Sequence, residues 1–263
     1  MKGDEIKLQV EFPYLGNELK EVIENYSKPV SFGYKVKKDR LGRKYIVFFA
    51  SFDRAVTKRI NTDISTGIVA MDFNFGHIDL TNIDSFGNLL DTKTINYEIT
   101  DNANQNIINL RRAIREAGDY VLKNKKILAI ENLDLKKLKE KCSYKNKKYN
   151  KMLHYFPSAR FNEFINSEAC NKEFEIIKVN PAYTSLIGQF KYAEDKKLNN
   201  HIAASYVIGR RALKMKDKIP KRYRALLPEK GQYKHCTKQW KSIQNKLKKL
   251  EAQKLEKQKN KNK

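Results

Sequence analysis

The sequence is poor in cysteine, and its three cysteines form no recognisable pattern. Cys142, Cys170 and Cys236 lie far apart, and no two of them stand in a C-x-x-C pair. A disulfide framework needs an even set and a zinc ribbon needs paired cysteines, so neither is expected. The adjacent His235 and Cys236 could be one half of a metal site, but surface residues in a basic segment are the preferred interpretation. We expect no zinc.

Long hydrophobic runs and internal repeats are also absent. No apolar stretch approaches the roughly 20 residues of a membrane-spanning helix. The N-terminal sequence MKGDEIKLQVEF lacks the apolar centre of a signal peptide. We therefore expect a cytoplasmic protein with no membrane partner.

Acidic residues are few beside the basic ones. Lys and Arg number 54 against 30 Asp and Glu, which gives a formal net charge of +24. This excess is far beyond what solubility needs, so the expected partner is a polyanion such as DNA or RNA. The 263 residues, 40% of them hydrophobic, can build a core in one large domain or two small ones.

The first part of the chain, residues 1–65, is predicted to be a small β-rich module. Apolar and polar residues alternate at 6–12 and at 44–49, which is typical of strands. A glycine-containing turn at 41–43 joins the second of these to a preceding strand at 33–37, so a hairpin is expected there.

The pattern of strands and helices expected in residues 66–215 indicates an α/β domain. Three strands separated by glycine-containing turns are followed by a helix, because apolar residues recur every three or four positions from Ile107 to Val121. A fully apolar strand at 126–130 is typical of a sheet buried on both faces. The predicted strands are 67–72, 77–83, 88–90, 126–130 and 174–179, with a Lys-rich helical region before the last of them and a final helix at 202–213. This order favours an RNase H-like mixed sheet flanked by helices.

Residues 216–263 are predicted to be a Lys-rich C-terminal helix and tail. Trp240, Ile243, Leu247 and Leu250 are spaced three and four apart, which indicates a short amphipathic helix. A solvated tail and a nucleic-acid-binding arm both remain open.

Two carboxylates lie at the strand ends where an RNase H-like fold has its catalytic residues. Such a site holds two divalent ions about 3.5 to 4 Å apart, which activate water and stabilise the leaving oxygen. Asp72 ends the first strand and Glu131 ends the apolar strand that follows the helix. A charge directly after an apolar run costs desolvation unless a cation compensates it. We predict that both are catalytic ligands of Mg²⁺ or Mn²⁺; ordinary strand-end charges that reach water are the alternative.

A third acidic ligand is expected at the start of the last helix, but the sequence has none there. Asn200 occupies that position, and its side-chain oxygen could coordinate metal without supplying charge. Capping of the helix by Asn200 is the favoured alternative. Asp79, Asp84 and Asp134 lie near the strands and are assigned no catalytic role; Asp79 alternates with Ile78 and Leu80, so it is expected to face solvent or a helix.

Taken in order, several segments resemble the TnpB/OrfB proteins of insertion sequences. The resemblance covers Gly67 to Arg211, and its most specific block is Asn-Pro-Ala-Tyr-Thr-Ser at 180–185. The other segments are Gly67–Ile78, Ile83–Leu89, Ile130–Asp134 and His201–Arg211. The preceding β-rich module resembles the C-terminal part of the wedge domain of these proteins, and the chain looks short at its N-terminus by comparison.

The resemblance implies an RNA-guided, Mg²⁺-dependent RuvC-type DNA endonuclease of a transposon, with DNA and a guide RNA as partners. Asp72 and Glu131 match the first two catalytic acids of the family, and the third falls on Asn200. Typical members also carry a four-cysteine zinc ribbon after the Thr-Ser pair, which this chain lacks. A nuclease-inactive DNA- or RNA-binding relative, or a truncated transposon remnant, is therefore the alternative. A basic RNA-associated protein without a transposon link would explain the charge but not the ordered carboxylates.

Overall fold

The computed structural model describes residues 7–25, 28–53, 63–132, 158–227 and 236–261. The chain divides into two compact units, Met1–Thr57 and Lys58–Lys263. The predicted Lys-rich helical region, with Asp134 and Cys142, and His235 lie outside the described residues. Within the described part of the chain, no helix is long and apolar enough to cross a membrane.

The first unit contains one helix and one hairpin. α1 (Gly16–Glu24) precedes β1 (Val30–Lys38) and β2 (Lys44–Phe52), which pair antiparallel. The turn between the strands is held by Asp39, whose Oδ1 accepts hydrogen bonds from the backbone N–H groups of Leu41 and Arg43 at 2.9 Å each. The predicted hairpin is confirmed. The strand predicted at 6–12 is wrong, since residues 7–12 pair with no other strand among the described residues.

A five-stranded mixed sheet forms the centre of the second unit, in the order β5-β4-β3-β6-β7. The first three strands along the chain pair antiparallel, and β6 and β7 continue the sheet in parallel from β3. The strands are β3 (Ile68–Asn74), β4 (His77–Ile83), β5 (Leu89–Asn96), β6 (Ile127–Glu131) and β7 (Ile176–Val179). This strand order and these directions are those of an RNase H-like fold, as predicted.

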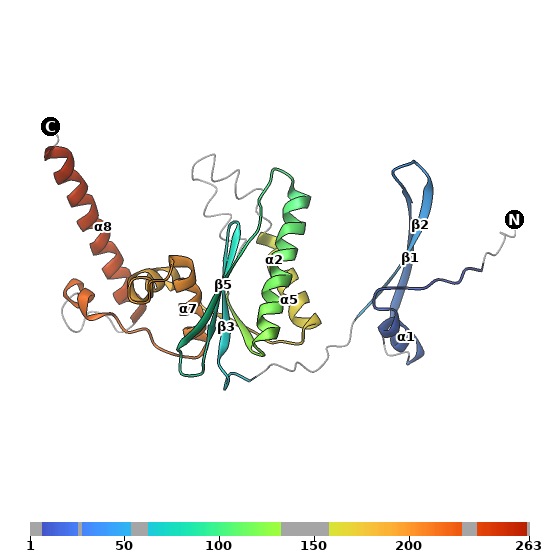
Figure 1. The fold of residues 1–263 in the computed structure, drawn as a ribbon, viewed down its shortest axis with the longest axis horizontal. Helices are drawn as coiled ribbons and strands as arrows, with labels where there is room; N and C mark the ends of the chain where they lie inside the picture. The colour runs from blue at the N-terminus through green and yellow to red at the C-terminus, as the bar shows by residue number, and fades with distance from the viewer. Residues whose placement is uncertain (1–6, 26–27, 54–62, 133–157, 228–235, 262–263) are drawn as a thin grey trace. The chain divides into compact units, whose positions relative to one another are not determined.

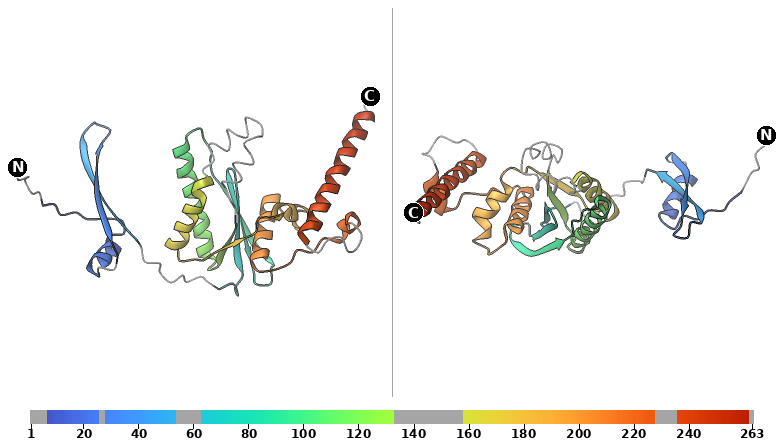
Figure 2. Two further views of the ribbon diagram at one scale, coloured as in Figure 1. Left: turned by 180° about the vertical axis from the view of Figure 1, so that it is seen from behind. Right: turned by 90° about the horizontal axis from the view of Figure 1, so that it is seen from above.

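Two helices cover one face of this sheet (Figures 1 and 2). α2 (Ala103–Lys123) begins at the cap residue Asn102, whose side chain accepts hydrogen bonds from the N–H groups of Asn104 and Gln105. α5 (Ser158–Asn171) packs beside α2. The core on this face joins sheet residues to helix residues; its fully buried members include Val69, Met71, Leu80, Leu128, Leu110, Ile114 and Ile165.

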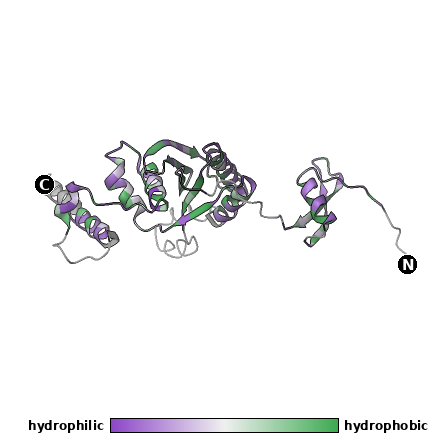
Figure 3. Cartoon of the chain, turned by 90° about the horizontal axis from the view of Figure 1, so that it is seen from below, coloured by the Kyte–Doolittle hydropathy of each residue, from purple (hydrophilic) through white to green (hydrophobic). Residues whose placement is uncertain are grey.

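α7 (Asn200–Ala212) crosses the opposite face of the sheet. It approaches closely at Gly209, where an added Cβ would lie 2.3 Å from Cδ1 of Ile83 and 2.9 Å from Cβ of Ala70. α6 (Thr184–Ile187) and the π-helix η1 (Gly188–Ala193) pack beside α7. Figure 3 shows hydrophobic residues concentrated on the strands between these layers.

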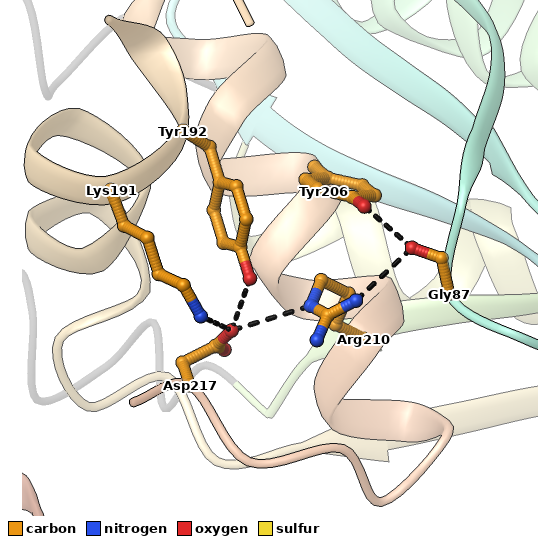
Figure 4. A network of polar contacts seen from close by, with 6 residues as sticks. All are labelled: Gly87, Lys191, Tyr192, Tyr206, Arg210 and Asp217. Carbon is orange, nitrogen blue, oxygen red and sulfur yellow. Dashed lines mark hydrogen bonds and ion pairs between the residues drawn. The ribbon is translucent and has the colours of Figure 1, made fainter. Parts of the chain in front are cut away.

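The chain after α7 remains part of this second core. Asp217, on the segment before the short helix η2 (Lys221–Leu226), accepts hydrogen bonds from Lys191 Nζ at 2.9 Å and from the Tyr192 hydroxyl (Figure 4). Arg210 Nε lies 3.3 Å from the same oxygen. In α8 (Cys236–Lys261), Trp240 and Ile243 are buried in the core under α7. The predicted C-terminal helix therefore exists, and its first turns are packed.

Candidate active site

Asp72, two residues before the end of β3, and Glu131, the last residue of β6, lie on neighbouring strands. The two strands are parallel neighbours with Met71 opposite Ile130, so Asp72 and Glu131 are the next residues along each strand. Met71 and Ile130 point into the core under α2, whereas Ala70 and Ala129 point into the core under α7. Because side chains alternate along a strand, both carboxylates lie on the α7 face. They share one end and one face of the sheet.

The carboxyl group of Glu131 is held in an environment that disfavours its charge. The pKa of Glu131 is raised to about 7, chiefly by burial and in smaller part by the negative charge of Asp72. The Thr184 hydroxyl donates a hydrogen bond to Oε1 of Glu131, which opposes the shift, as does the charge of Arg211. Asp72 is 7% exposed, and its Oδ2 accepts a hydrogen bond of 2.9 Å from the Asn74 amide.

Asp79 adds a third carboxylate to the same row. It lies opposite Asp72 in the antiparallel pairing of β3 with β4. Its side chain is on the α7 face, as is that of Ile83 four residues later, and the residue is completely buried. Of the two orientations left open by the sequence, the structure shows the one toward a helix. Burial raises the pKa of Asp79, while a 2.6 Å hydrogen bond from the Thr94 hydroxyl to Oδ1 lowers it.

Two histidines that the sequence analysis missed stand beside these carboxylates. Nε2 of His77 lies 3.3 Å from Oδ2 of Asp79, and Nδ1 of His201 lies 3.5 Å from Oδ2 of Asp72. The two imidazole rings meet edge to face with centroids 4.8 Å apart. The hydrogen bond to Asp72 is the main reason that the pKa of His201 is raised. His77, Asp79 and His201 each offer one ligand atom, and these atoms lie within 4.8 Å of one another.

The beginning of α7 differs from the prediction by one residue. The cap is Asn199, whose Oδ1 accepts a 2.7 Å hydrogen bond from the N–H of Ile202. The capping role predicted for Asn200 is therefore wrong; Asn200 is the first helical residue, and it is exposed. The first turn of α7 contains no acidic residue, and the residue of this turn that reaches Asp72 is His201. Ligation of metal by Asn200 stays a prediction.

The block at 180–185 orients Glu131. Asn180 Oδ1 accepts a 2.9 Å hydrogen bond from the N–H of Ala182, and Tyr183 adopts a left-handed backbone with φ 64°. The guanidinium of Arg211, near the end of α7, donates hydrogen bonds to the backbone carbonyls of Asn180 and Ala182. This bent segment presents the hydroxyl of Thr184 to Glu131.

The side chain of Asp84 stabilises a turn. Its Oδ1 accepts hydrogen bonds from the backbone N–H groups of Phe86 and Asn88, at 3.0 and 2.7 Å. This arrangement closes the turn between β4 and β5.

Comparison with known proteins gives a structural likeness and no likeness in sequence. No family model and no curated protein matches the sequence. Among solved structures, RuvC of Thermus thermophilus is similar with a TM-score of 0.34 and 11% sequence identity, over 54% of this chain and 90% of that chain.

Proposed function

We propose that this protein is a divalent-metal-dependent nuclease in which Asp72 and Glu131 hold the metal. The observation that carries the proposal is the placement of both carboxylates at the same end and on the same face of two adjacent parallel strands. Converging carboxylates at strand ends are what a two-metal phosphodiesterase needs.

The donor set fits Mg²⁺ or Mn²⁺. Both ions prefer carboxylate oxygens, and two such groups stand side by side here. The pKa of Glu131 is raised to about 7 mainly by burial, which supports a carboxylate that a bound cation would neutralise. When bound, the ions would activate water and stabilise the leaving oxygen. Thr184 and Asn74 hold the two carboxylates in place by their hydrogen bonds.

A nucleic acid is the substrate class that the charge supports. With a net charge of +24, Lys and Arg side chains can neutralise phosphates and give affinity without reading sequence. The finer part of the proposal is that the chain is a transposon-encoded, TnpB-like DNA endonuclease that uses a guide RNA. The ordered segments support it, since the block at 180–185 orients Glu131 and the segment from His201 to Arg211 packs beside both carboxylates.

The test compares Asp72→Asn and Glu131→Gln with the parent chain on single- and double-stranded DNA in Mg²⁺ and in Mn²⁺. Loss of a group that merely orients a metal ligand costs about 10- to 100-fold, so each variant should lose at least that much cleavage. Asp119→Asn is the matched control, because Asp119 lies on α2 with 65% of its side chain exposed. Equal cleavage by all four proteins would overturn the proposal.

A nuclease-inactive nucleic-acid-binding protein is the second candidate. The absence of an acidic residue from the first turn of α7 favours it. The parent chain would then bind DNA or RNA and cleave neither at any Mg²⁺ or Mn²⁺ concentration. Sequencing the nucleic acid that co-purifies with the protein tests guidance directly, and a uniform short RNA with a common 3′ part is the result expected of a guided enzyme.

A further inference from the structure

One oxygen of Asp79 is buried without a hydrogen bond. Asp79 is completely buried, and Oδ1 is occupied by the Thr94 hydroxyl at 2.6 Å. Oδ2 accepts no hydrogen bond from any described residue. It points toward His77, whose Nε2 lies 3.3 Å away. A buried carboxylate oxygen in this state is costly unless a cation or donor satisfies it.

Two imidazoles converge on the same point from different elements. His77 is the first residue of β4, and His201 lies in the first turn of α7. One ligand atom from each, together with a carboxylate oxygen of Asp79, lies within 4.8 Å of the others. Ligands of one ion at about 2.1 Å stand roughly 3.4 Å apart in a tetrahedron and 4.2 Å apart when opposite each other. The His201 side chain is 52% exposed, so a small rotation of it can close the remaining distance.

We propose that His77, Asp79 and His201 form a binding site for one divalent first-row transition-metal ion. Two imidazole nitrogens and one carboxylate oxygen suit Mn²⁺, Fe²⁺, Co²⁺ or Zn²⁺ better than Mg²⁺, which favours oxygen ligands. Thr94 supports the site by holding Oδ1, which leaves Oδ2 to coordinate the ion. Affinity should rise from Mn²⁺ through Co²⁺ to Zn²⁺.

The site adjoins the catalytic pair, because His201 also contacts Asp72 at 3.5 Å. The ion could also take part in cleavage, and this part of the inference rests on the proposed function. An ion held here would stand next to Asp72, on the side of the sheet where the first turn of α7 supplies no acidic ligand. Binding of the ion does not depend on cleavage and can be measured alone.

The experiment titrates the full chain with Co²⁺ and follows the visible absorption of the bound ion. With millimolar Mg²⁺ present to occupy the Asp72–Glu131 pair, we expect one bound Co²⁺ ion, which Zn²⁺ displaces. His77→Gln, Asp79→Asn and His201→Gln should each weaken Co²⁺ binding by tenfold or more. His154→Gln and His235→Gln are the matched controls, because they replace the other two of the four histidines and should leave binding unchanged.

Circular dichroism of each metal-free variant checks the fold. If Asp79→Asn fails to fold, the two histidine variants decide, because His77 and His201 are only partly buried. Co²⁺ binding that survives both histidine substitutions, or that is lost in a control variant, overturns the inference.

The two proposals fail in different ways. Glu131→Gln should lose cleavage and retain Co²⁺ binding. A parent chain that binds Co²⁺ at these residues but never cleaves nucleic acid would overturn the proposed function and leave the metal site standing. A chain that cleaves DNA in Mg²⁺ but binds no Co²⁺ would overturn the metal site alone.

Discussion

Asp79 lies directly opposite Asp72 across the antiparallel pair of β3 and β4. The turn from Asn74 to His77 fixes this register, because these two residues are themselves paired at the end of the hairpin. Both side chains therefore point to the face that α7 covers, where the negative charge of Asp72 contributes to the raised pKa of Asp79. Two buried carboxylates side by side repel each other and lower the stability of the protein. A bound cation would neutralise them and remove this cost.

The first prediction is that Glu131→Gln increases stability at high pH. The pKa of Glu131 is about 7 in the folded protein, above its ordinary value of 4.5. Between these values the unfolded chain loses the proton that the folded chain keeps, so stability falls as pH rises from about 4.5 to 7. The full effect is up to about 3 kcal/mol. Denaturant unfolding without divalent ions at pH 4 and pH 8 should show the variant gaining stability over the parent only at pH 8; an equal difference at both pH values would contradict the assignment.

A second prediction concerns Asn200→Asp. The variant places a carboxylate in the first turn of α7, beside the residue that contacts Asp72. An acid near a helix N-terminus is favourable and Asn199 keeps the cap, so stability should barely change. Mg²⁺-dependent cleavage of single-stranded DNA should rise or appear, and Asp72→Asn in the same protein should abolish it. Asn199→Asp, which preserves capping at the neighbouring position, is the control and should gain nothing.

The close approach of α7 gives a third prediction. In Gly209→Ala the added methyl group would lie 2.3 Å from Cδ1 of Ile83, which can rotate away. It would also lie 2.9 Å from Cβ of Ala70, which cannot, so the helix or the strand must shift. Overpacking of this kind costs about 1 to 3 kcal/mol. Thermal unfolding should show a lower midpoint than the parent. Ala203→Gly, in the same helix, is the comparison. It removes a methyl group from the core, so it tests the loss of packing, whereas Gly209→Ala tests overpacking.

The fourth prediction tests whether α8 contacts nucleic acid. Removing everything after Met215 would also remove the buried Trp240 and Ile243, so substitution is the cleaner experiment. Lys→Gln at 248, 249, 254 and 257 keeps the helix and removes four charges. If the helix binds duplex DNA, the slope of log affinity against log salt should flatten by about 0.9 for each phosphate that these lysines neutralise in the parent. An unchanged slope and affinity would show that these lysines do not contact DNA.

Much of the second unit could be predicted, because apolar runs mark strands buried on both faces. The predicted strands 67–72, 77–83 and 126–130 match β3, β4 and β6 to within two residues at each end. The segment 6–12 has the same alternation but no partner strand among the described residues, and a strand needs one. The alternation of apolar and polar residues did not decide which way Asp79 points. Helices cover both faces of the sheet, so a polar side chain on either face can be buried.

The proximity of His77 and His201 could not be predicted from the sequence. Asp72 and Glu131 could be found because each ends an apolar run. His77 and His201 are separated by more than a hundred residues, and nothing in either local sequence links them. The register of β3 with β4 would have placed Asp79 opposite Asp72 once the turn was known. The position of His201 depends on how α7 lies across the sheet, which is a property of packing.

The close packing at Gly209 also matters for the alignment of the site. His201 lies eight residues before Gly209, which is about 12 Å along a helix axis. A tilt of α7 by about 10° at Gly209 would carry the imidazole roughly 2 Å, more than the tolerance of a metal–ligand bond. We therefore expect a substitution of Gly209, which is not itself a ligand, to misplace the start of α7 even where the protein stays folded.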